Sequence, residues 1–330
     1  MKDASAAINE RTVAPSAPRS HVVAFLVLLA IGVVAPFFVY PIFLAKLLCF
    51  ALFACAFNLL IGYVGLLSFG HAAFFGFAAY ATGHAAKVWS LPPEIAILAG
   101  TAAAAVLGLA FGLLAIRRQG IYFAMITLAL AQMLFFFCLQ APFTAGEDGI
   151  QAIPRGTMFG VLRLEDTMTL YFVVLAIFMF GFLLIFRAIR SPFGQVLKAI
   201  RENERRAVSL GYKVDHYKLI AFVLSAALSG LAGGTKAIVF QLASLTDVHW
   251  TMSGEVVLMT LLGGLGTVFG PVAGAAIIIS MQNYLAQLGG WVTVVQGAIF
   301  VVCVLTFRRG IIGELARALK RPLLKGLLLH

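Results

Sequence analysis

Long apolar runs separated by short polar segments dominate this chain of 330 residues. Runs such as residues 121–139 and 170–186 are longer and less interrupted than the alternating strands of a membrane barrel. A helix needs about 20 apolar residues to cross the hydrocarbon core of a bilayer. The pattern therefore predicts an all-α polytopic membrane protein with about ten transmembrane helices, some of them discontinuous. We place the spans at residues 22–40, 42–61, 67–86, 94–116, 120–140, 168–187, 218–238, 254–265, 267–286 and 289–307.

Composition agrees with this class, because 62% of the residues are hydrophobic and 11% are charged. A soluble domain usually carries about 25% charged residues. The first apolar run is too long for a signal peptide and lacks a clean cleavage site, so we expect a membrane helix there. The predicted organisation is a polar tail over residues 1–20, a transmembrane domain over residues 21–307 and a basic tail over residues 308–330.

The basic residues predict the orientation of the spans. Of the 24 Lys and Arg residues, 19 lie in the N-terminal tail, the 117–119 turn, the 187–218 loop and the C-terminal tail. Ten alternating spans place these four segments on one side, which the positive-inside rule makes cytoplasmic. We therefore expect a multi-pass protein of a bacterial inner (plasma) membrane with both termini in the cytoplasm. The short span at 254–265 could also be re-entrant, although the even number of spans favours a full crossing.

Small residues recur at four-residue spacing within several predicted spans. In lipid, such ridges let helix backbones approach closely, because packing rather than hydrophobicity joins the helices. We therefore expect close helix contacts along two ridges, Ala104–Gly108–Gly112 and Ser225–Ser229–Gly233.

Two glycine-rich stretches interrupt the apolar pattern at residues 59–76 and 261–274, and both pass from Leu-Leu through glycines to Phe-Gly. Their weak similarity suggests an internal repeat. Glycine breaks in apolar runs indicate discontinuous helices, which flank the substrate path in many transporters. The predicted helix-break glycines are Gly62, Gly65, Gly70, Gly263, Gly264, Gly266 and Gly270.

A polar cluster accompanies the first break. Ser68 and His71 are three residues apart and are expected to share a helix face, with Asn58 nearby. Buried polar groups in membranes are costly, so they are usually paired or functional. Two roles stay open for His71, a hydrogen bond between helices, which we favour, and contact with a substrate. The candidates for a translocation path are Asn58, Ser68, His71 and Gln132, whereas Lys236 and Glu255 are expected to snorkel at the outer ends of their spans.

No motif for chemistry of the chain's own is present. The sequence has no phosphate-binding P-loop, no zinc-binding His-Glu-x-x-His and no nucleophile elbow. The four cysteines lie in apolar runs without the spacing of a metal site. We therefore expect no catalytic residue, no metal and no cofactor in this chain. Because the spans contain almost no charge for ion coupling, any energy for uphill transport would come from another subunit.

The largest polar segment is residues 191–214, SPFGQVLKAIRENERRAVSLGYKV, which carries seven charged side chains. Pro192 suits the first turn of a helix, and Gly211 suits its end. Apolar residues between them recur near helical spacing. The segment is therefore predicted to form one amphipathic cytoplasmic helix at about residues 191–211, with a solvated loop as the alternative.

Several stretches together resemble a known family. They are NLLIGYVGLLSFGHAAFFGFAAY, GIYFAMITLALAQ, EDGIQAIP, SPFGQVLKAIRENERRAVSLGY and GEVVLMTLLGGLGTVFGPVAGA. Over residues 44–305 the chain is similar to the permeases of bacterial ATP-binding-cassette importers for branched-chain amino acids, specifically the LivM-type subunits. The resemblance implies a transport subunit rather than an enzyme.

In that family the polar segment is the coupling helix, which docks on a cytoplasmic ATPase. The resemblance assigns this role to six residues. Four of them would face the partner, namely Glu202, Asn203, Glu204 and Ala207; Arg201 begins the set and Gly211 ends the helix. It also implies a second, H-type permease chain, two ATPase subunits that use ATP and Mg, and a periplasmic binding protein. The outer loop 141–167 could receive the binding protein or be a plain solvated loop.

The alternatives left open concern the cargo and the class of transporter. The same architecture would serve urea, short amides or aromatic acids. A less favoured class is an autonomous channel or secondary carrier. No basic stripe on a soluble domain points to nucleic acid.

Overall fold

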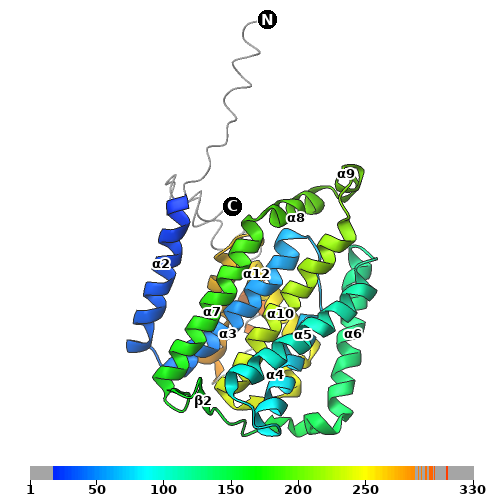
Figure 1. Cartoon of the computed structure of the whole chain (residues 1–330). Coiled ribbons are helices and arrows are strands. Elements are labelled where there is room, and N and C mark those ends of the chain that lie inside the picture. The colour runs from blue at the N-terminus through cyan, green and yellow to red at the C-terminus, as the bar shows by residue number, and fades with distance from the viewer. Residues whose placement is uncertain are drawn as a thin grey trace, which may run out of the picture.

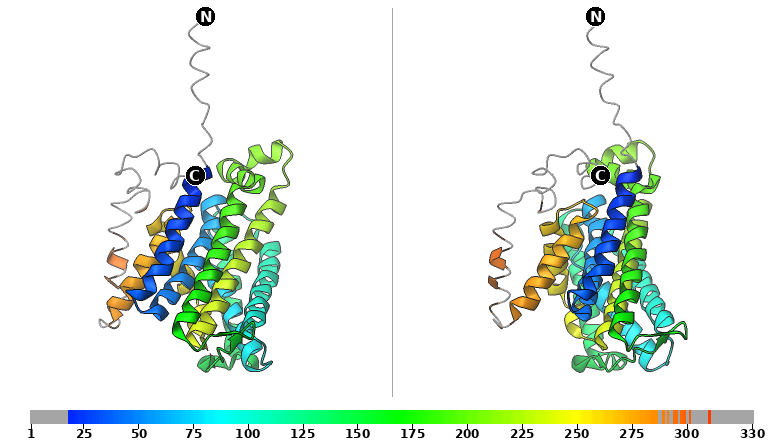
Figure 2. Two further views of the ribbon diagram at one scale, coloured as in Figure 1. Left: turned by 60° about the vertical axis from the view of Figure 1, so that its left-hand side comes forward. Right: turned by 90° about the vertical axis from the view of Figure 1, so that its left-hand side faces the viewer.

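The structure is a computed structural model that describes residues 18–286 and, beyond them, residues 289, 291, 294–295, 297–299, 301 and 310. Helices dominate this part of the chain and run alongside one another as a bundle (Figures 1 and 2). The α-helices are α2 (Pro18–Val34), α3 (Pro41–Tyr63), α4 (His71–Lys87), α5 (Pro93–Ala115), α6 (Ile121–Gln140), α7 (Thr167–Arg190), α8 (Pro192–Glu202), α9 (Glu204–Ser209), α10 (Val214–Phe240), α11 (Leu245–Val248), α12 (Trp250–Gly263) and α13 (Gly270–Tyr284).

Among the residues that the structure describes, five helices are long and apolar enough to cross a membrane: α3, α5, α6, α7 and α10. Within their most apolar stretches, 78% of the residues of α3 and α10 are buried, against 33% for α5 and α6. A helix that is apolar all round is suited to the centre of a bundle. The core therefore lies around α3 and α10, while the outer helices leave large apolar side chains exposed, as lipid-facing helices do.

Close contacts along the predicted small-residue ridges join α10 to its neighbours. At Gly108 of α5 an added Cβ would collide with the side chain of Ala226, and at Gly233 of α10 one would collide with the Phe75 carbonyl of α4. Because any side chain here would push the backbones apart, these glycines set the spacing of the bundle. The prediction of close packing along both ridges is confirmed.

The helices alternate in direction, so the polar segments gather at two ends. At one end, at the top of Figure 1, lie α8 and α9. At the opposite end lie two 3-10 turns, Pro142–Thr144 and Gly146–Asp148, and four short strands. We refer to the end with α8 and α9 as the inner end and to the other as the outer end. The assignment of the inner end to the cytoplasm stays a prediction.

The loop at the outer end is hydrogen-bonded to the bundle. Strand β1 (Ile150–Gln151) pairs antiparallel with β4 (Leu242–Ala243), which follows α10, and β2 (Thr157–Met158) pairs antiparallel with β3 (Leu162–Arg163). The Ile153 N–H donates to the Gln241 carbonyl at 3.1 Å, and the Gln241 side chain donates back to the Ile153 carbonyl at 3.1 Å. The interpretation of 141–167 as a plain solvated loop is therefore wrong for residues 150–153.

Two predicted spans have different limits. The helix expected at 22–40 ends at Val34 and continues as a 3-10 turn, Ala35–Phe37, because Pro36 has no N–H to extend the helical ladder. The helix expected at 254–265 begins earlier, at Trp250, where the His249 side chain accepts from the Thr251 N–H. Most of the span expected at 289–307 lies outside the described residues, so the number of ten helices is not confirmed.

Candidate functional site

The polar segment forms two helices rather than the single helix predicted. Asn203 separates α8 from α9 with an extended backbone (φ −157°, ψ 97°), and its Oδ1 accepts a hydrogen bond from the Arg206 N–H at 3.0 Å. Asparagine is a preferred N-cap, since its side chain satisfies a free backbone donor of the next helix. The one-helix prediction is wrong at this residue because the cap restarts the helix in a new direction.

Gly211 ends this segment as predicted. Its φ of +87° lies in the left-handed region that glycine adopts without steric penalty. Its N–H donates to the Val208 carbonyl at 2.9 Å, and the Tyr212 N–H donates to the Ala207 carbonyl at 3.2 Å. These bonds satisfy carbonyls at the end of α9 and turn the chain toward α10.

The apolar face of the segment is turned toward the protein. Ile200, Ala207 and Val214 form a small buried cluster, against which Val196 and Tyr217 pack. Ala207 was expected to face a partner, and that expectation is wrong. A methyl group between Ile200 and Val214 is held by apolar contact with its own chain.

Glu204 anchors α9 to two other segments. Its Oε1 lies 2.6 Å from the Lys218 Nζ of α10 and accepts a hydrogen bond at 2.7 Å from Gln119, in the turn between α5 and α6. Lys218 is only 2% exposed, whereas Glu204 is 26% exposed. The sequence reasoning missed Lys218 and Gln119, although a lysine at the start of an apolar span was a usable signal.

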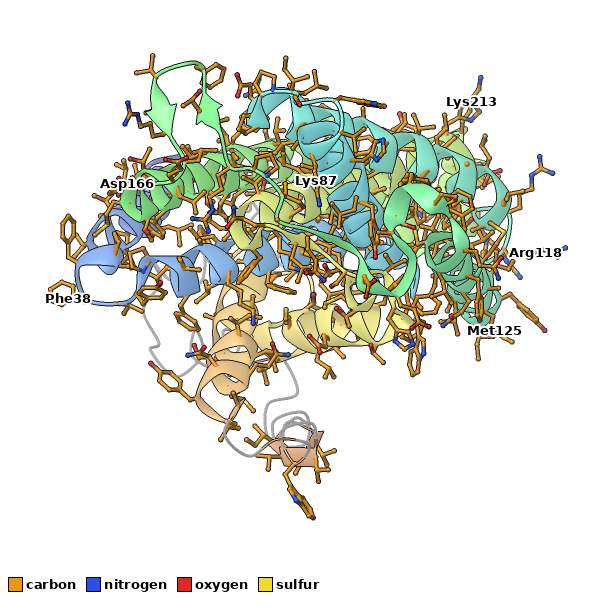
Figure 3. The ribbon with its side chains drawn as sticks, turned by 90° about the horizontal axis from the view of Figure 1, so that it is seen from below. Phe38, Lys87, Arg118, Met125, Asp166 and Lys213 are labelled. Atoms are coloured by element: carbon orange, nitrogen blue, oxygen red, sulfur yellow. The ribbon has the colours of Figure 1, made fainter. Side chains whose placement is uncertain are left out.

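The free surface of the inner end combines apolar and charged side chains. Val208, Leu210 and Tyr212 are exposed, and charged residues surround them on the same short segment. These charged and polar neighbours are Glu202, Asn203, Arg205, Arg206 and Lys213. Figure 3 shows Lys213 and Arg118 projecting outward from the rim. An apolar centre with a charged rim has the composition of a protein interface.

Both predicted glycine breaks are non-helical. The chain leaves helical structure between α3 and α4 (residues 64–70) and between α12 and α13 (residues 264–269). Positive φ angles occur at Gly65 (+82°), Gly264 (+117°) and Gly266 (+73°). The other glycines flank the breaks: Gly62 in the last turn of α3, Gly70 before α4, Gly263 at the end of α12 and Gly270 at the start of α13. These glycines therefore lie at helix ends and in the connections between helices; that the helices are discontinuous within the membrane stays a prediction.

The two breaks, some 200 residues apart in the chain, lie against each other. The Asn58 side chain donates to the Thr267 carbonyl at 2.9 Å and accepts from the Gly266 N–H at 3.0 Å. A Cβ at Gly62 would lie 2.8 Å from the Gly266 nitrogen, so only glycine permits this approach. The Asn58 side chain of α3 therefore holds the end of that helix against the second break by hydrogen bonds. The sequence did not reveal this contact.

Arg201 connects α8 to this paired structure. Its Nη1 donates a hydrogen bond to the Gly62 carbonyl, in the last turn of α3. Its Cγ lies 3.1 Å from where a Cβ of Gly65 would stand, and its Nη1 lies 3.2 Å from the equivalent point at Gly266. One side chain of the polar segment thus rests on both glycine breaks.

His71 joins three helices. Its Nε2 lies 2.8 Å from the Ser225 Oγ of α10, and the Ser225 hydroxyl donates to the Ala56 carbonyl of α3 at 2.6 Å. Because the hydroxyl proton is committed to Ala56, Nε2 must be the donor to Ser225, and Nδ1 has no hydrogen-bond partner in the described structure. This geometry gives His71 the helix-bonding role that we favoured; contact with a substrate stays a prediction.

The remaining path candidates are separate from His71. Ser68 precedes α4 and its Oγ accepts from the Gly70 N–H at 3.2 Å, so it does not share a helix face with His71 as expected. Gln132 lies half-buried on α6. The structure does not bring the four candidates into one lined path.

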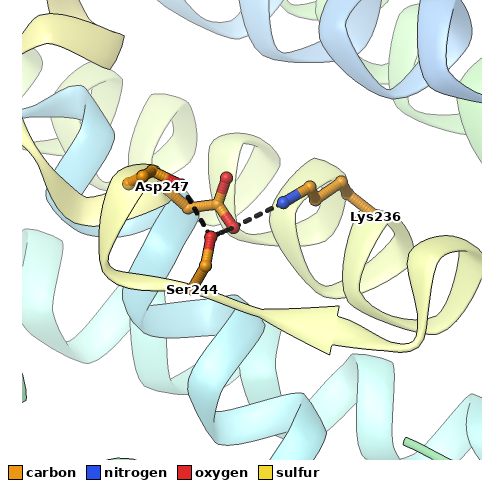
Figure 4. A network of polar contacts seen from close by, with 4 residues as sticks. Lys236, Ser244 and Asp247 are labelled. Atoms are coloured by element: carbon orange, nitrogen blue, oxygen red, sulfur yellow. Dashed lines mark hydrogen bonds and ion pairs between the residues drawn. The ribbon is translucent and has the colours of Figure 1, made fainter. Parts of the chain in front are cut away.

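An ion pair at the outer end corrects the expectation for Lys236. Its Nζ lies 2.5 Å from Asp247 Oδ2, and Ser244 Oγ donates to the same oxygen at 3.2 Å (Figure 4). Both side chains are largely buried, so Lys236 does not snorkel to the surface. The pattern of the span could not show this, because the acid comes from α11, after the helix has ended.

Comparison with known proteins agrees with this architecture. Residues 40–304 match the family described as "Branched-chain amino acid transport system / permease component". The high-affinity branched-chain amino acid transport permease LivM of Escherichia coli K12 is 27% identical over 296 residues, which cover 81% of this chain and 67% of that protein. LivM of Salmonella typhimurium LT2 is 26% identical over the same shares.

Sugar permeases are also similar over shorter regions. The ribose import permease RbsC of Bacillus subtilis is 30% identical over 196 residues, covering 54% of this chain and 58% of that protein. No solved structure matches the chain. Because the family match extends over most of the sequence and includes both glycine breaks and the α8–α9 segment, the chain belongs to the branched-chain amino acid transport permeases of the ATP-binding-cassette family.

Proposed function

We propose that this chain is the LivM-type permease subunit of an importer that moves branched-chain or related hydrophobic amino acids across a bacterial inner membrane. Two cytoplasmic ATPase subunits supply the energy from ATP with Mg, a second, H-type permease chain completes the pathway, and a periplasmic binding protein delivers the substrate. Family membership and similarity to two LivM proteins support this assignment.

The observation that carries the coupling mechanism is the contact of Arg201 with both glycine breaks. Glu202, Asn203 and the exposed apolar residues after them form the surface that docks on the ATPase. Ala207 holds the segment to its own protein, and Glu204 ties α9 to α10 through Lys218. A displacement of α8 and α9 by the ATPase therefore acts on the two breaks through Arg201 of α8 and on α10 through Glu204 of α9.

The glycine breaks are suited to respond to such a displacement. Their backbone groups lack the continuous hydrogen-bond ladder of a helix, and Asn58 makes them move as one unit. Hinges that absorb changes in φ and ψ are typical of transporters and other switching proteins. In this mechanism ATP binding and hydrolysis rock the helices between inward-open and outward-open states.

The test compares Arg201→Gln with Arg205→Gln in the complete importer reconstituted in proteoliposomes. Arg205 is an exposed arginine on α9, in the same polar segment. We expect Arg201→Gln to lower leucine uptake at least tenfold while the ATPase stays bound and hydrolyses ATP. The reason is that a displacement of α8 no longer moves the glycine breaks. Uptake at the normal rate in this variant would contradict the coupling role.

Partner assignment has its own test. An ATPase should co-purify with the intact chain and be lost when residues 198–211 are scrambled. A thermal-shift screen of the partner binding protein decides the cargo among branched-chain amino acids, urea, short amides, aromatic acids and sugars. Robust flux through this chain reconstituted alone would instead favour a channel or secondary carrier.

A further inference from the structure

A cavity lies at the inner end of the bundle, where α7 ends and α8 begins (Figure 1). Its volume is about 500 Å³, and it is lined by Leu183, Phe186, Arg187, Arg190, Ser191 and Pro192. This lining contains two arginines and no acid. The cavity therefore has an excess of positive charge, which favours an anionic ligand.

Both arginines belong to the last turn of α7 and are exposed. The Arg190 guanidinium lies 4.5 Å from the centre of the Phe186 ring, and this cation–π contact holds it against the apolar lining. The Arg187 side chain has no hydrogen-bond or ion-pair partner among the residues that the structure describes. Guanidinium groups bind phosphate oxygens through charge-assisted hydrogen bonds. Two of them, three residues apart on one helix, suit a phosphate group.

The start of α8 adds a partial positive charge to the same cavity. The N-terminus of a helix favours an anion, because its first N–H groups lack intrahelical acceptors. Pro192, the first of the 11 residues of α8, lines the cavity, and the first turn of the helix contains no acid. The Ser191 hydroxyl does not cap this end but donates to the Ala188 carbonyl at 2.7 Å. The chain thus supplies no side-chain cap for α8 within the described residues.

An apolar surface extends from the cavity toward the middle of α7. Leu183, Leu184 and Phe180 are 48%, 38% and 58% exposed, and all three lie within seven residues of Arg187. Half of a bilayer core about 30 Å thick corresponds to about ten helical residues. An acyl chain of one leaflet can therefore pack along these side chains while its headgroup enters the cavity. A free phosphate ion would use the arginines but not this apolar surface.

We propose that the cavity binds the headgroup of an anionic phospholipid, with the phosphate at Arg187, Arg190 and the start of α8. An acyl chain of this lipid lies along Leu183 and Phe180. The inference goes beyond the proposed function and does not depend on it, because it needs only that α7 crosses the membrane. The bound lipid holds the junction of α7 and α8, at the opposite end of α8 from Arg201.

The test measures lipid binding to the complex purified from membranes in detergent. Native mass spectrometry is used with phosphatidylglycerol and phosphatidylcholine that carry the same acyl chains. The wild-type complex should bind phosphatidylglycerol at least tenfold more tightly, because only this lipid has a net negative charge. The double variant Arg187→Gln with Arg190→Gln should weaken phosphatidylglycerol binding at least tenfold.

The matched control is the double variant Arg117→Gln with Arg118→Gln. It removes the same charge from exposed residues of the turn between α5 and α6, at the same end of the bundle but outside this cavity, and should bind phosphatidylglycerol as the wild type does. Arg187→Lys with Arg190→Lys should restore most of the binding, which separates a loss of charge from a loss of folding.

Four results would overturn the site. They are equal affinity for the two lipids, equal weakening in both glutamine variants, displacement of phosphatidylglycerol by an equal concentration of inorganic phosphate, and no phosphatidylglycerol bound to the wild-type complex. Displacement by phosphate would assign the cavity to a free anion. Absence of bound lipid would show that another protein chain covers it in the complex.

Discussion

Lys218 and Lys236 lie on the same helix, α10, near opposite ends, and each forms an ion pair with an acid from outside the helix. The acid of the inner pair, Glu204, belongs to the six-residue helix α9 and is 26% exposed. The acid of the outer pair, Asp247, is 4% exposed and belongs to α11, which packs against α4. At Gly76 of α4 the absence of a side chain lets the Asp247 backbone approach.

The difference indicates two roles for the same kind of ion pair. The outer pair is built into the core, where breaking it exposes a charge to a low dielectric. The inner pair joins two segments through a carboxylate that is partly open to water, although its partner Lys218 is buried. We interpret the outer pair as a fixed structural contact. We interpret the inner pair as a contact between α9 and α10 that a docking partner can break and re-form.

The largest expected effect comes from breaking the outer pair. Asp247→Asn leaves the Lys236 ammonium buried without a counter-charge and should destabilise the protein by about 3–5 kcal/mol. Thermal denaturation of the purified complex in detergent measures this loss. Asp148→Asn, an exposed acid at the same end, is the control and should have almost no effect. The double variant Lys236→Met with Asp247→Leu should recover most of the stability; if it does not, the pair is more than a neutral support.

A smaller effect is expected at the inner pair. Glu204→Ala should destabilise the protein by about 1 kcal/mol, because the carboxylate is partly solvated and its loss lets water reach Lys218. The difference in stability between Glu204→Ala and the wild type should decrease at high ionic strength, since salt screens exposed pairs more than buried ones. The same thermal measurement at two salt concentrations checks this, with Glu202→Ala as the exposed control. A loss as large as that of Asp247→Asn would remove the distinction between the two ends.

The smallest effect concerns the turn that leads into the inner end of α10. Gly211→Ala should cost about 1 kcal/mol, because a φ of +87° is strained for any residue with a Cβ even though no atom blocks the space. Gly254→Ala is the matched control: it lies in helix α12 with open space around it, and should be neutral or slightly stabilising. Equal stability of both variants would show that Gly211 is not needed for the turn.

Local pattern was sufficient for much of the architecture. Apolar runs of about 20 residues predicted the long helices, glycine clusters predicted both breaks, and Pro192 and Gly211 marked the limits of the polar segment. The observed helix limits differ from the predicted ones where a residue interrupts the helical hydrogen bonds. Pro36 does so because it has no N–H, and Asn203 does so because its side chain caps a new helix. The single-helix prediction failed there because helical spacing of apolar residues does not reveal a cap in the middle of the pattern.

Candidate site residues were predicted less well, because their roles depend on partners distant in sequence. Ala207 matched the expected coupling segment but is buried against Ile200 and Val214. Asn58 was expected near a path and instead joins the two breaks. Which of the path candidates contacts a substrate stays a prediction.

The sequence by itself determined the class of the protein, its helical segments, its glycine breaks and its family, because hydrophobic run length, backbone freedom and motif similarity are properties of contiguous residues. Only the tertiary structure decided that Arg201 rests on both breaks and that Lys236 is paired within the protein. The physical reason is that charge pairing and burial depend on distances across the bundle, and residues such as Arg201 and Gly62, 139 positions apart, come close only when the helices pack.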